Sequence, residues 1–248
     1  MPENTPVALI TGSAHRLGAR TAQMLHDRGW NLVIHYRSRE AQADGLVKAM
    51  NHQRQNSAIA LQADLSEIAD TRLLGHEAAE QWGRLDALVN NASVFYPNPT
   101  PEATEDDWDN IMHTNLKAPF FLMQACLPAL RESAGSVVNL IDIYSEKPLP
   151  EHPLYCASKA GLAALTRSWA KDLAPEVRVN GVSPGAILWP EGDAAVDAGY
   201  QSRILDKTPL KRTGTPDDIA RTIVFLLTEA PFITGQIISV DGGRSLNM

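Results

Sequence analysis

A tyrosine and a lysine four residues apart, Tyr155 and Lys159, form the pair in this chain whose types and spacing best suit chemistry. Residues at this spacing lie on one face of a helix, about one turn apart. A nearby ammonium favours the phenolate, so we expect Lys159 to lower the tyrosine pKa from its ordinary value of about 10. Such a phenol can hand a proton to a substrate while a cofactor delivers hydride. The same spacing also occurs on ordinary helix surfaces, so the interpretation depends on the residues upstream.

Two polar residues upstream could serve the same reaction. Asp142 ends the apolar segment 136–142, and a carboxyl at the end of a buried strand should have a raised pKa and can stay protonated. The alternative is an exposed strand-end aspartate that only makes a turn. Asn115 lies inside the helical pattern 105–130, where an asparagine can mark a local irregularity that holds water.

The chain opens with a pattern typical of dinucleotide binding. An apolar run (7–10) is followed by a glycine-containing turn and an amphipathic stretch (19–28). We expect Gly12 to allow the tight turn and Gly18 to let the helix approach the strand closely. Arg16 stands where the usual fingerprint has its middle glycine, so this pattern alone leaves a plain β-α turn open.

The end of the next apolar run, 31–39, carries His35, Arg37, Ser38 and Arg39 and no carboxylate. A site that prefers NAD generally places an acid here to bind the ribose 2′-hydroxyl. Two guanidiniums and a hydroxyl instead suit a 2′-phosphate. We therefore predict NADP(H), with simple solvation of these charges as the alternative.

Three later residues are further candidates for ligand contact. Asp64 follows the predicted strand 58–62 and could meet an adenine edge, although capping of a helix beginning near Ser66 is the favoured role. Ser93, after the strand 85–89, could donate to a phosphate or a ribose. Phe95 could stack on a flat ligand or simply pack within its loop.

The elements alternate β and α along the whole chain. This order predicts a single domain, 1–248, with a Rossmann-type doubly wound parallel sheet of about seven strands and helices on both faces. The segment 187–211 is the least regular, so we predict a substrate lid there. Trp189 within it could cover the substrate or only pack.

Composition limits the partners. With 22 basic and 29 acidic residues the net charge is −7, which gives no basic field for nucleic acid. No apolar run approaches the roughly 20 residues needed to cross a bilayer, and the N-terminus does not read as a signal peptide. Two cysteines make no disulfide framework, and we identify no metal-binding motif. We expect a cytoplasmic protein with no membrane or nucleic-acid partner.

At this point the chain resembles the short-chain dehydrogenase/reductase family over almost its whole length. The matching motifs are Thr11-Gly12…Gly18, Asn90-Asn91-Ala92, Asn115, Tyr155…Lys159, Pro184-Gly185 and Asp241-Gly242-Gly243. Two departures, Arg16 for the middle glycine and Asp142 for the usual catalytic serine, resemble the pteridine reductase branch. So do the segments 35–38, 91–97 and 240–246.

This resemblance implies NADPH-dependent reduction of a pterin such as dihydrobiopterin or dihydromonapterin, with dihydrofolate as a further candidate. By analogy Asp142 and Tyr155 supply the proton, Lys159 binds the nicotinamide ribose, and Asn115 holds a relay water. The pterin would lie between the nicotinamide and Phe95. The residues implied for the cofactor are Gly12, Arg16, Leu17, Gly18, His35, Tyr36, Arg37, Ser38, Asp64, Leu65, Asn91, Ala92, Ser93, Tyr155, Lys159, Pro184 and Gly185. Those implied for the substrate are Arg16, Ser93, Phe95, Asp142, Tyr155, Leu188 and Trp189. A homotetramer is expected from the family alone.

The chemistry of pterin reduction gives a reason for Asp142 in place of the usual serine. Reduction of a ring C=N bond requires protonation at nitrogen, for which a carboxylic acid kept neutral by burial is a better donor than a serine hydroxyl. The nearest alternative is a general carbonyl or 3-oxoacyl-thioester reductase that happens to carry Asp142. A non-catalytic NADP(H) sensor is less favoured, because a sensor needs no proton relay. The enoyl reductase branch is disfavoured because its tyrosine and lysine are more widely spaced.

Overall fold

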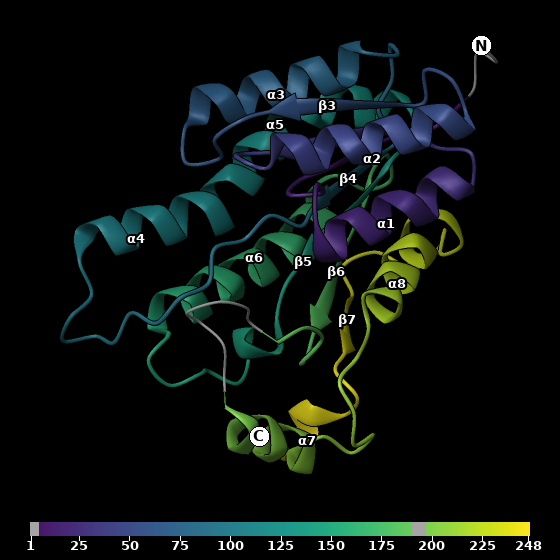
Figure 1. Cartoon of the computed structure of the whole chain (residues 1–248). Coiled ribbons are helices and arrows are strands. Elements are labelled where there is room, and N and C mark those ends of the chain that lie inside the picture. Colours follow the sequence, from purple (N-terminus) through teal and green to yellow (C-terminus); the bar gives the residue numbers. More distant parts are fainter. Residues whose placement is uncertain (1–4, 190–196) are drawn as a thin grey trace.

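The computed structural model describes residues 5–189 and 197–248. Within them, seven parallel strands form one sheet in the order β3-β2-β1-β4-β5-β6-β7 (Figure 1). The strands are β1 (Val7–Ile10), β2 (Asn31–Tyr36), β3 (Ala58–Gln62), β4 (Ala87–Asn90), β5 (Ser136–Leu140), β6 (Arg178–Pro184) and β7 (Ile237–Val240). The helices are α1 (Arg16–Asp27), α2 (Glu40–Gln53), α3 (Ile68–Glu80), α4 (Glu105–Met112), α5 (Ala118–Glu132), α6 (Pro153–Asp172), α7 (Ala198–Lys207) and α8 (Pro216–Thr228). Shorter turns are the π-helix η1 (His113–Lys117) and the 3-10 helices η2 (Ile143–Ser145) and η4 (Arg244–Asn247). This confirms the predicted doubly wound fold.

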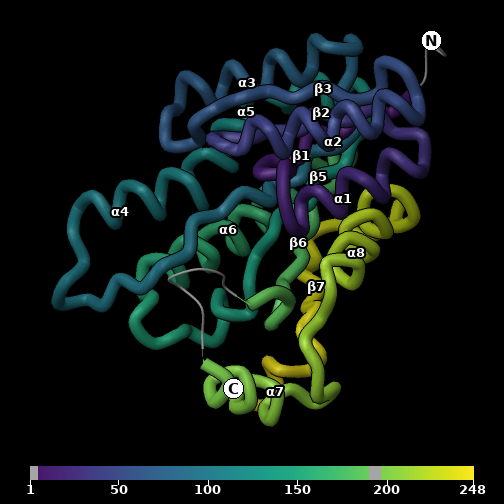
Figure 2. The backbone as a smooth tube through the Cα atoms, viewed as in Figure 1, coloured from purple at the N-terminus to yellow at the C-terminus, as the bar shows by residue number. Residues whose placement is uncertain are grey.

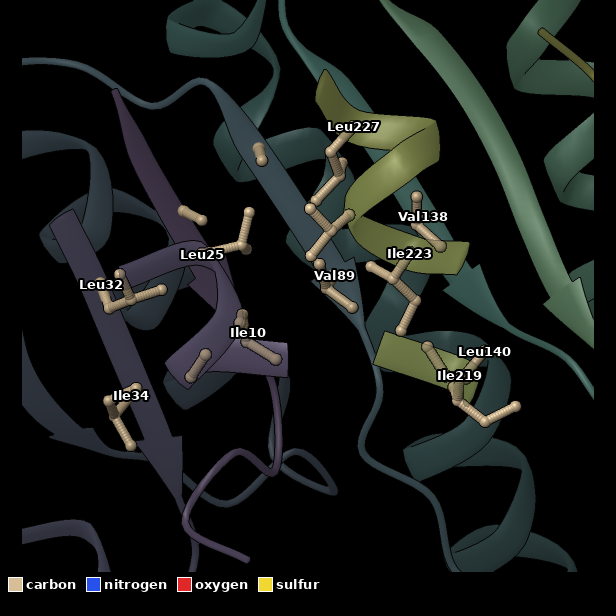
Figure 3. Close-up of a cluster of buried hydrophobic side chains, with 14 of the residues drawn as sticks. Ile10, Leu25, Leu32, Ile34, Val89, Val138, Leu140, Ile219, Ile223 and Leu227 are labelled. Carbon is tan, nitrogen blue, oxygen red and sulfur yellow. The ribbon is translucent and has the colours of Figure 1, made fainter. Parts of the chain in front are cut away.

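Both faces of the sheet are covered, which explains the unbroken apolar runs of its central strands. Successive side chains of a strand point to opposite faces, so Leu9 and Ile10 enter different cores. Ile10 packs in the cluster that contains Leu25 of α1 and Ile223 of α8, and Figure 3 shows these side chains gathered over the sheet. Leu9 belongs to the opposite cluster, built with α3, α5 and α6. The two cores hold the carboxyl ends of the strands in fixed register.

The helices have ordinary sequence signals at their ends. Thr104 and Thr215 each form a capping box with an aspartate three residues later, which satisfies amides at the starts of α4 and α8. In the described part of the chain no helix is long and apolar enough to cross a membrane. Cys126 and Cys156 are both buried and free, so the expected lack of a disulfide framework is confirmed.

Several predicted boundaries need correction. The helix expected over 105–130 is divided by the π-helix η1, which confirms the irregularity predicted at Asn115. The irregular segment expected over 187–211 contains α7, so that prediction is wrong for 198–207, while 190–196 lies outside the described residues. Also, α1 begins at Arg16, three residues earlier than expected.

The strand order reverses between β1 and β4, because the chain builds outward from β1 on both sides. In open α/β sheets this point, at the carboxyl ends of the strands, is where ligands bind. The C-terminal residues return to the same end of the molecule and lie beside α7 (Figure 2). Two contacts fix them there: Leu210 N–H donates to the Gly242 carbonyl, and Asn247 Nδ2 donates to the Lys207 carbonyl.

Candidate active site

A cavity of about 510 Å³ runs along the carboxyl ends of β1, β2, β4 and β5. Its volume is within the range of small-molecule and cofactor sites. Of the residues implied for the cofactor, Gly18 does not line the cavity and all the others do. Those that line it are Gly12, Arg16, Leu17, His35, Tyr36, Arg37, Ser38, Asp64, Leu65, Asn91, Ala92, Ser93, Tyr155, Lys159, Pro184 and Gly185. Of the substrate residues, Asp142 and Leu188 also line it, whereas Phe95 and Trp189 do not.

The glycine turn after β1 has the geometry that its sequence predicts. Gly12 has φ +62°, and a Cβ there would lie 3.1 Å from the Ala92 Cα. A Cβ on Gly18 would lie 2.7 Å from Asn91 Nδ2, so only glycine permits this approach of α1 to the end of β4. Arg16 has φ +54°, a left-handed conformation that explains why a glycine is usual at this position.

The first turn of α1 is open to an anion. Its N-cap residue, His15, makes no side-chain capping hydrogen bond, and no acidic residue stands in the first turn. The first amides of a helix otherwise lack partners, and the helix dipole favours negative charge there. Together with the glycine turn, this end of α1 fits the pyrophosphate of a dinucleotide.

His35 links the glycine turn to the sheet. It is only 2% exposed, and its Nδ1 accepts from the Gly12 amide at 2.9 Å while Nε2 lies 3.1 Å from the Ala63 carbonyl. Burial lowers the His35 pKa to about 4, so the ring is neutral. Its side chain therefore supports the glycine turn, whereas Arg37 and Ser38 line the cavity with exposed side chains.

Arg37 and Arg39 are exposed at the end of β2, and within the described ranges neither guanidinium has a salt-bridge partner. The prediction that Asp64 caps the next helix is wrong. Asp64 Oδ1 accepts from the amide and the hydroxyl of Ser66 in a turn, and α3 begins later, at Ile68. The amide hydrogen bond from Ser66 is the main cause of a lowered Asp64 pKa.

Three side chains predicted to be catalytic meet at the inner end of the cavity. Tyr155 Oη donates to Asp142 Oδ2 at 2.8 Å, and the Tyr144 amide donates to Asp142 Oδ1 at 2.9 Å. Lys159 Nζ donates to the Leu140 carbonyl at 2.8 Å and lies 5.8 Å from the centre of the Tyr155 ring. Strand β5 and helix α6 thus bring together a carboxyl, a phenol and an ammonium.

Burial dominates the acid-base properties of this cluster. It raises the Asp142 pKa, as predicted for a carboxyl at a buried strand end. Burial and the neighbouring Asp142 also raise the Tyr155 pKa well above its ordinary value, so the predicted lowering by Lys159 is wrong in this arrangement. The reason is geometric, because the ammonium faces the Leu140 carbonyl and the ring rather than the phenolic oxygen. Burial lowers the Lys159 pKa to about 8, and Asp142 opposes this effect.

Asn115 is buried in η1 and does not line the cavity. Its Oδ1 accepts from the Val94 amide at 2.8 Å, and its Nδ2 donates to the Val94 carbonyl and to Ser158 Oγ. Asn115 therefore fixes the loop after β4 against α6. The water relay implied for it stays a prediction.

Phe95 contacts Tyr155 from this loop. Its ring meets the Tyr155 ring edge-on, with centroids 4.8 Å apart, and stacks on His152 at 4.7 Å. Phe95 is still 47% exposed, so its ring packs on Tyr155 and His152 and also remains accessible to a ligand. The sequence analysis missed His152, which is the N-cap residue of α6, three residues before Tyr155.

The comparison with known proteins decides the family. A sequence model described as enoyl-(acyl carrier protein) reductase matches residues 12–245. The chain belongs to the short-chain dehydrogenase/reductase family. Since relatives of this family are oxidoreductases, the site is that of an enzyme.

Among this short-chain reductase's relatives is pteridine reductase 1 of Leishmania tarentolae, 34% identical, covering 97% of this chain and 96% of the relative. A 3-oxoacyl-(acyl-carrier-protein) reductase of Staphylococcus aureus is 35% identical, covering 96% and 98%. An uncharacterised oxidoreductase of Methylorubrum extorquens is 36% identical, covering 96% of each chain. The two named activities stand at nearly equal similarity, so the choice between them depends on the site.

The start of the predicted lid also touches this reductase's cavity. Arg16 Nη2 donates to the Trp189 carbonyl at 3.2 Å, and Leu188 is 40% exposed beside the cavity. These contacts join the segment after β6 to the first turn of α1. Residues 190–196 of the predicted lid lie outside the part of the chain that the structure describes.

Proposed function

We propose that this protein is an NADPH-dependent reductase of a pterin, such as dihydrobiopterin or dihydromonapterin, with dihydrofolate as a further candidate. The observation that carries this proposal is the hydrogen bond from Tyr155 to Asp142. Asp142 is a carboxyl whose pKa is raised by burial, which suits protonation of a ring nitrogen better than polarisation of a ketone.

The residues present fit NADPH. The uncapped start of α1 and the glycine turn suit its pyrophosphate, and Arg37 with Ser38 suits the 2′-phosphate. Lys159 lines the cavity beside Tyr155, where it would bind the nicotinamide ribose. When bound, the cofactor would supply the hydride.

The chain's own part in the reaction is to hold and move a proton. Protonated Asp142 donates to the substrate nitrogen, and the carboxylate left behind already accepts a hydrogen bond from Tyr155 Oη. Tyr155 can therefore return a proton to Asp142. The Lys159 ammonium, buried one helical turn from Tyr155, favours the carboxylate that forms at Asp142.

Phe95 supports a flat substrate. Its ring lies next to Tyr155 and remains about half exposed, which suits stacking on an aromatic heterocycle. Pteridine reductase 1 of Leishmania tarentolae, at 34% identity, is consistent with this assignment.

A second candidate is reduction of 3-oxoacyl thioesters, which the relative from Staphylococcus aureus favours at 35% identity. A non-catalytic cofactor sensor is disfavoured, because burial of Tyr155 and Lys159 beside the half-buried Asp142 carboxyl is unfavourable in free energy and a sensor has no use for these groups.

The experiment compares substrates. Loss of NADPH absorbance is followed with dihydrobiopterin, dihydrofolate and a simple 3-ketoester at equal concentrations. The proposal expects turnover with a pterin or dihydrofolate. Turnover with the ketoester alone would replace it with the second candidate, and NADPH binding without turnover of any substrate would favour a sensor.

By analogy with the family we also propose a single domain over 1–248 with a lid at 187–211, a homotetramer, and a cytoplasmic location. Light scattering of the purified protein tests the oligomeric state. A mass equal to one chain would contradict the tetramer.

A further inference from the structure

Arg244, in the C-terminal turn η4, is a buried cation close to the proposed proton donor. Only 6% of the residue is exposed. Its Nη2 donates to Tyr144 Oη at 2.9 Å, and its guanidinium carbon lies 5.5 Å from the centre of the Tyr144 ring. Over residues 5–189 and 197–248, no carboxylate lies within salt-bridge distance of Arg244, and its buried Nε has no hydrogen-bond partner. Burial of an unneutralised charge is unfavourable, so a functional role would explain why Arg244 is buried here.

The turn that carries Arg244 is firmly built. The two carboxylate oxygens of Asp241 accept from the amides of Gly243 and Ser245. Gly242 and Gly243 both have positive φ, which glycine adopts without strain. This geometry directs the Arg244 side chain toward η2, the turn that follows β5.

Tyr144 connects this cation to Asp142 through two different groups, its side-chain hydroxyl and its backbone amide. Arg244 donates to the hydroxyl of Tyr144, the Tyr144 amide donates to Asp142 Oδ1, and Tyr155 donates to Asp142 Oδ2. Each oxygen of the Asp142 carboxyl is thus held by one donor. One of these donors belongs to the residue that Arg244 fixes in place.

We propose that Arg244 is a positioning residue for proton donation: through Tyr144 it holds the Asp142 carboxyl against Tyr155, and its charge sets the pH range in which that carboxyl donates. Arg244 does not line the cavity, so it acts through Tyr144 and through its field rather than by touching substrate. The inference rests on the proposed role of Asp142 as the proton donor.

The charged and titratable groups around Asp142 determine the sign of the effect. They are Tyr155, Cys156 and Lys159 on α6, Tyr144 on η2 and Arg244 on η4, with Tyr200 of α7 facing Tyr144. The two cations in this set oppose the burial that raises the Asp142 pKa. Removing the Arg244 charge therefore raises that pKa further, so the donor keeps its proton to a higher pH.

The test is the pH dependence of kcat/KM in the full-length protein. For Arg244→Met we expect the basic limb to move up by at least about half a pH unit, because a nearby cation is lost. We also expect kcat to fall at least about 5-fold, because Asp142 is less well held. Arg244→Lys should return the limb toward its wild-type position. Arg131→Met, which changes an exposed arginine of α5, is the matched control and should change neither quantity.

Two further variants keep the test decisive. Arg244→Gln retains hydrogen-bonding capacity without charge and should show the same limb shift if Arg244→Met does not fold. Tyr144→Phe removes the hydroxyl that Arg244 binds but keeps the Arg244 charge. We therefore expect kcat to fall while the basic limb of the pH profile stays nearly unmoved. A lower rate with an unshifted limb in both neutral variants of Arg244 would mean a structural role only and would overturn the proposal.

The choice of assay substrate distinguishes failure of this inference from failure of the proposed function. If the wild type reduces only the ketoester, pterin reduction is wrong, and the same pH profiles are measured with the ketoester. NADPH affinity should stay within about 2-fold of the wild type in every Arg244 variant, because Arg244 lies outside the cavity. A large loss of NADPH affinity would contradict the positioning role.

Discussion

Tyr155 donates its phenolic hydrogen to Asp142 across 2.8 Å, with the acceptor in the turn that follows β5 and the donor on helix α6. Burial raises the pKa of both residues, so near neutral pH the phenol is intact and the carboxyl holds its proton more firmly than an exposed aspartate does. We propose that these two groups together supply the proton for the reaction.

Tyr155→Phe removes the hydroxyl and keeps the ring. We expect turnover to fall at least about 100-fold, since proton transfer by a positioned group contributes at least that much. NADPH affinity, measured by fluorescence titration, should be nearly intact. Near-normal turnover would remove Tyr155 from the mechanism.

Arg37→Asp places a carboxylate where we propose that the 2′-phosphate binds. NADPH affinity should weaken at least about 10-fold, while NADH affinity should change less than about 2-fold. Arg131→Asp makes the same charge change on the outer surface of α5 and controls for general electrostatics. Equal losses for both cofactors would show that Arg37 does not bind the phosphate.

Phe95→Ala removes the half-exposed ring beside Tyr155. The KM for a pterin should rise about 10-fold through loss of stacking, with the KM for NADPH unchanged. Phe232→Ala, at a fully exposed phenylalanine, is the control. An unchanged pterin KM would leave Phe95 as a packing residue only.

His35 makes stability depend on pH. Its pKa falls from about 6.5 in the unfolded chain to about 4 in the native protein, so between these values only the unfolded chain binds the proton. This contribution is present above about pH 6.5 and is lost as the pH falls toward 4, by up to about 3 kcal/mol. Urea unfolding at pH 7.5 and 5 should therefore show a smaller pH effect for His35→Asn than for the wild type. Equal pH effects in the two proteins would contradict the assignment.

Local patterns were sufficient to predict most of the site. Tyr155 and Lys159 share a helix face by spacing alone. Asp142 was predicted to end the strand 136–142; β5 instead ends at Leu140 and Asp142 begins the next turn, but its place beyond the carboxyl end of a parallel strand still follows from the fold class. The glycine turn was equally readable, because steric limits at Gly12 and Gly18 leave little choice of residue.

The predictions that the structure contradicts concern residues whose surroundings are set by tertiary contacts. Lowering of the Tyr155 pKa was expected from charge, but the degree of burial and the direction of Lys159 outweigh it. The Asp64 turn replaced the expected cap because Ser66 supplies two donors at once. The contact of Arg244 with Tyr144 joins residues 100 positions apart in the sequence, so no local sequence pattern predicts it.

The most direct test of the central claim is Asp142→Ser, assayed beside the wild type with dihydrobiopterin and with a 3-ketoester. If a carboxyl is needed to protonate ring nitrogen, the variant should lose at least about 100-fold in kcat/KM for the pterin, while its activity on the ketoester stays within about 10-fold or rises. An unchanged rate with the pterin in Asp142→Ser would contradict proton donation by Asp142, and equal losses with both substrates would show that the residue does not select a pterin.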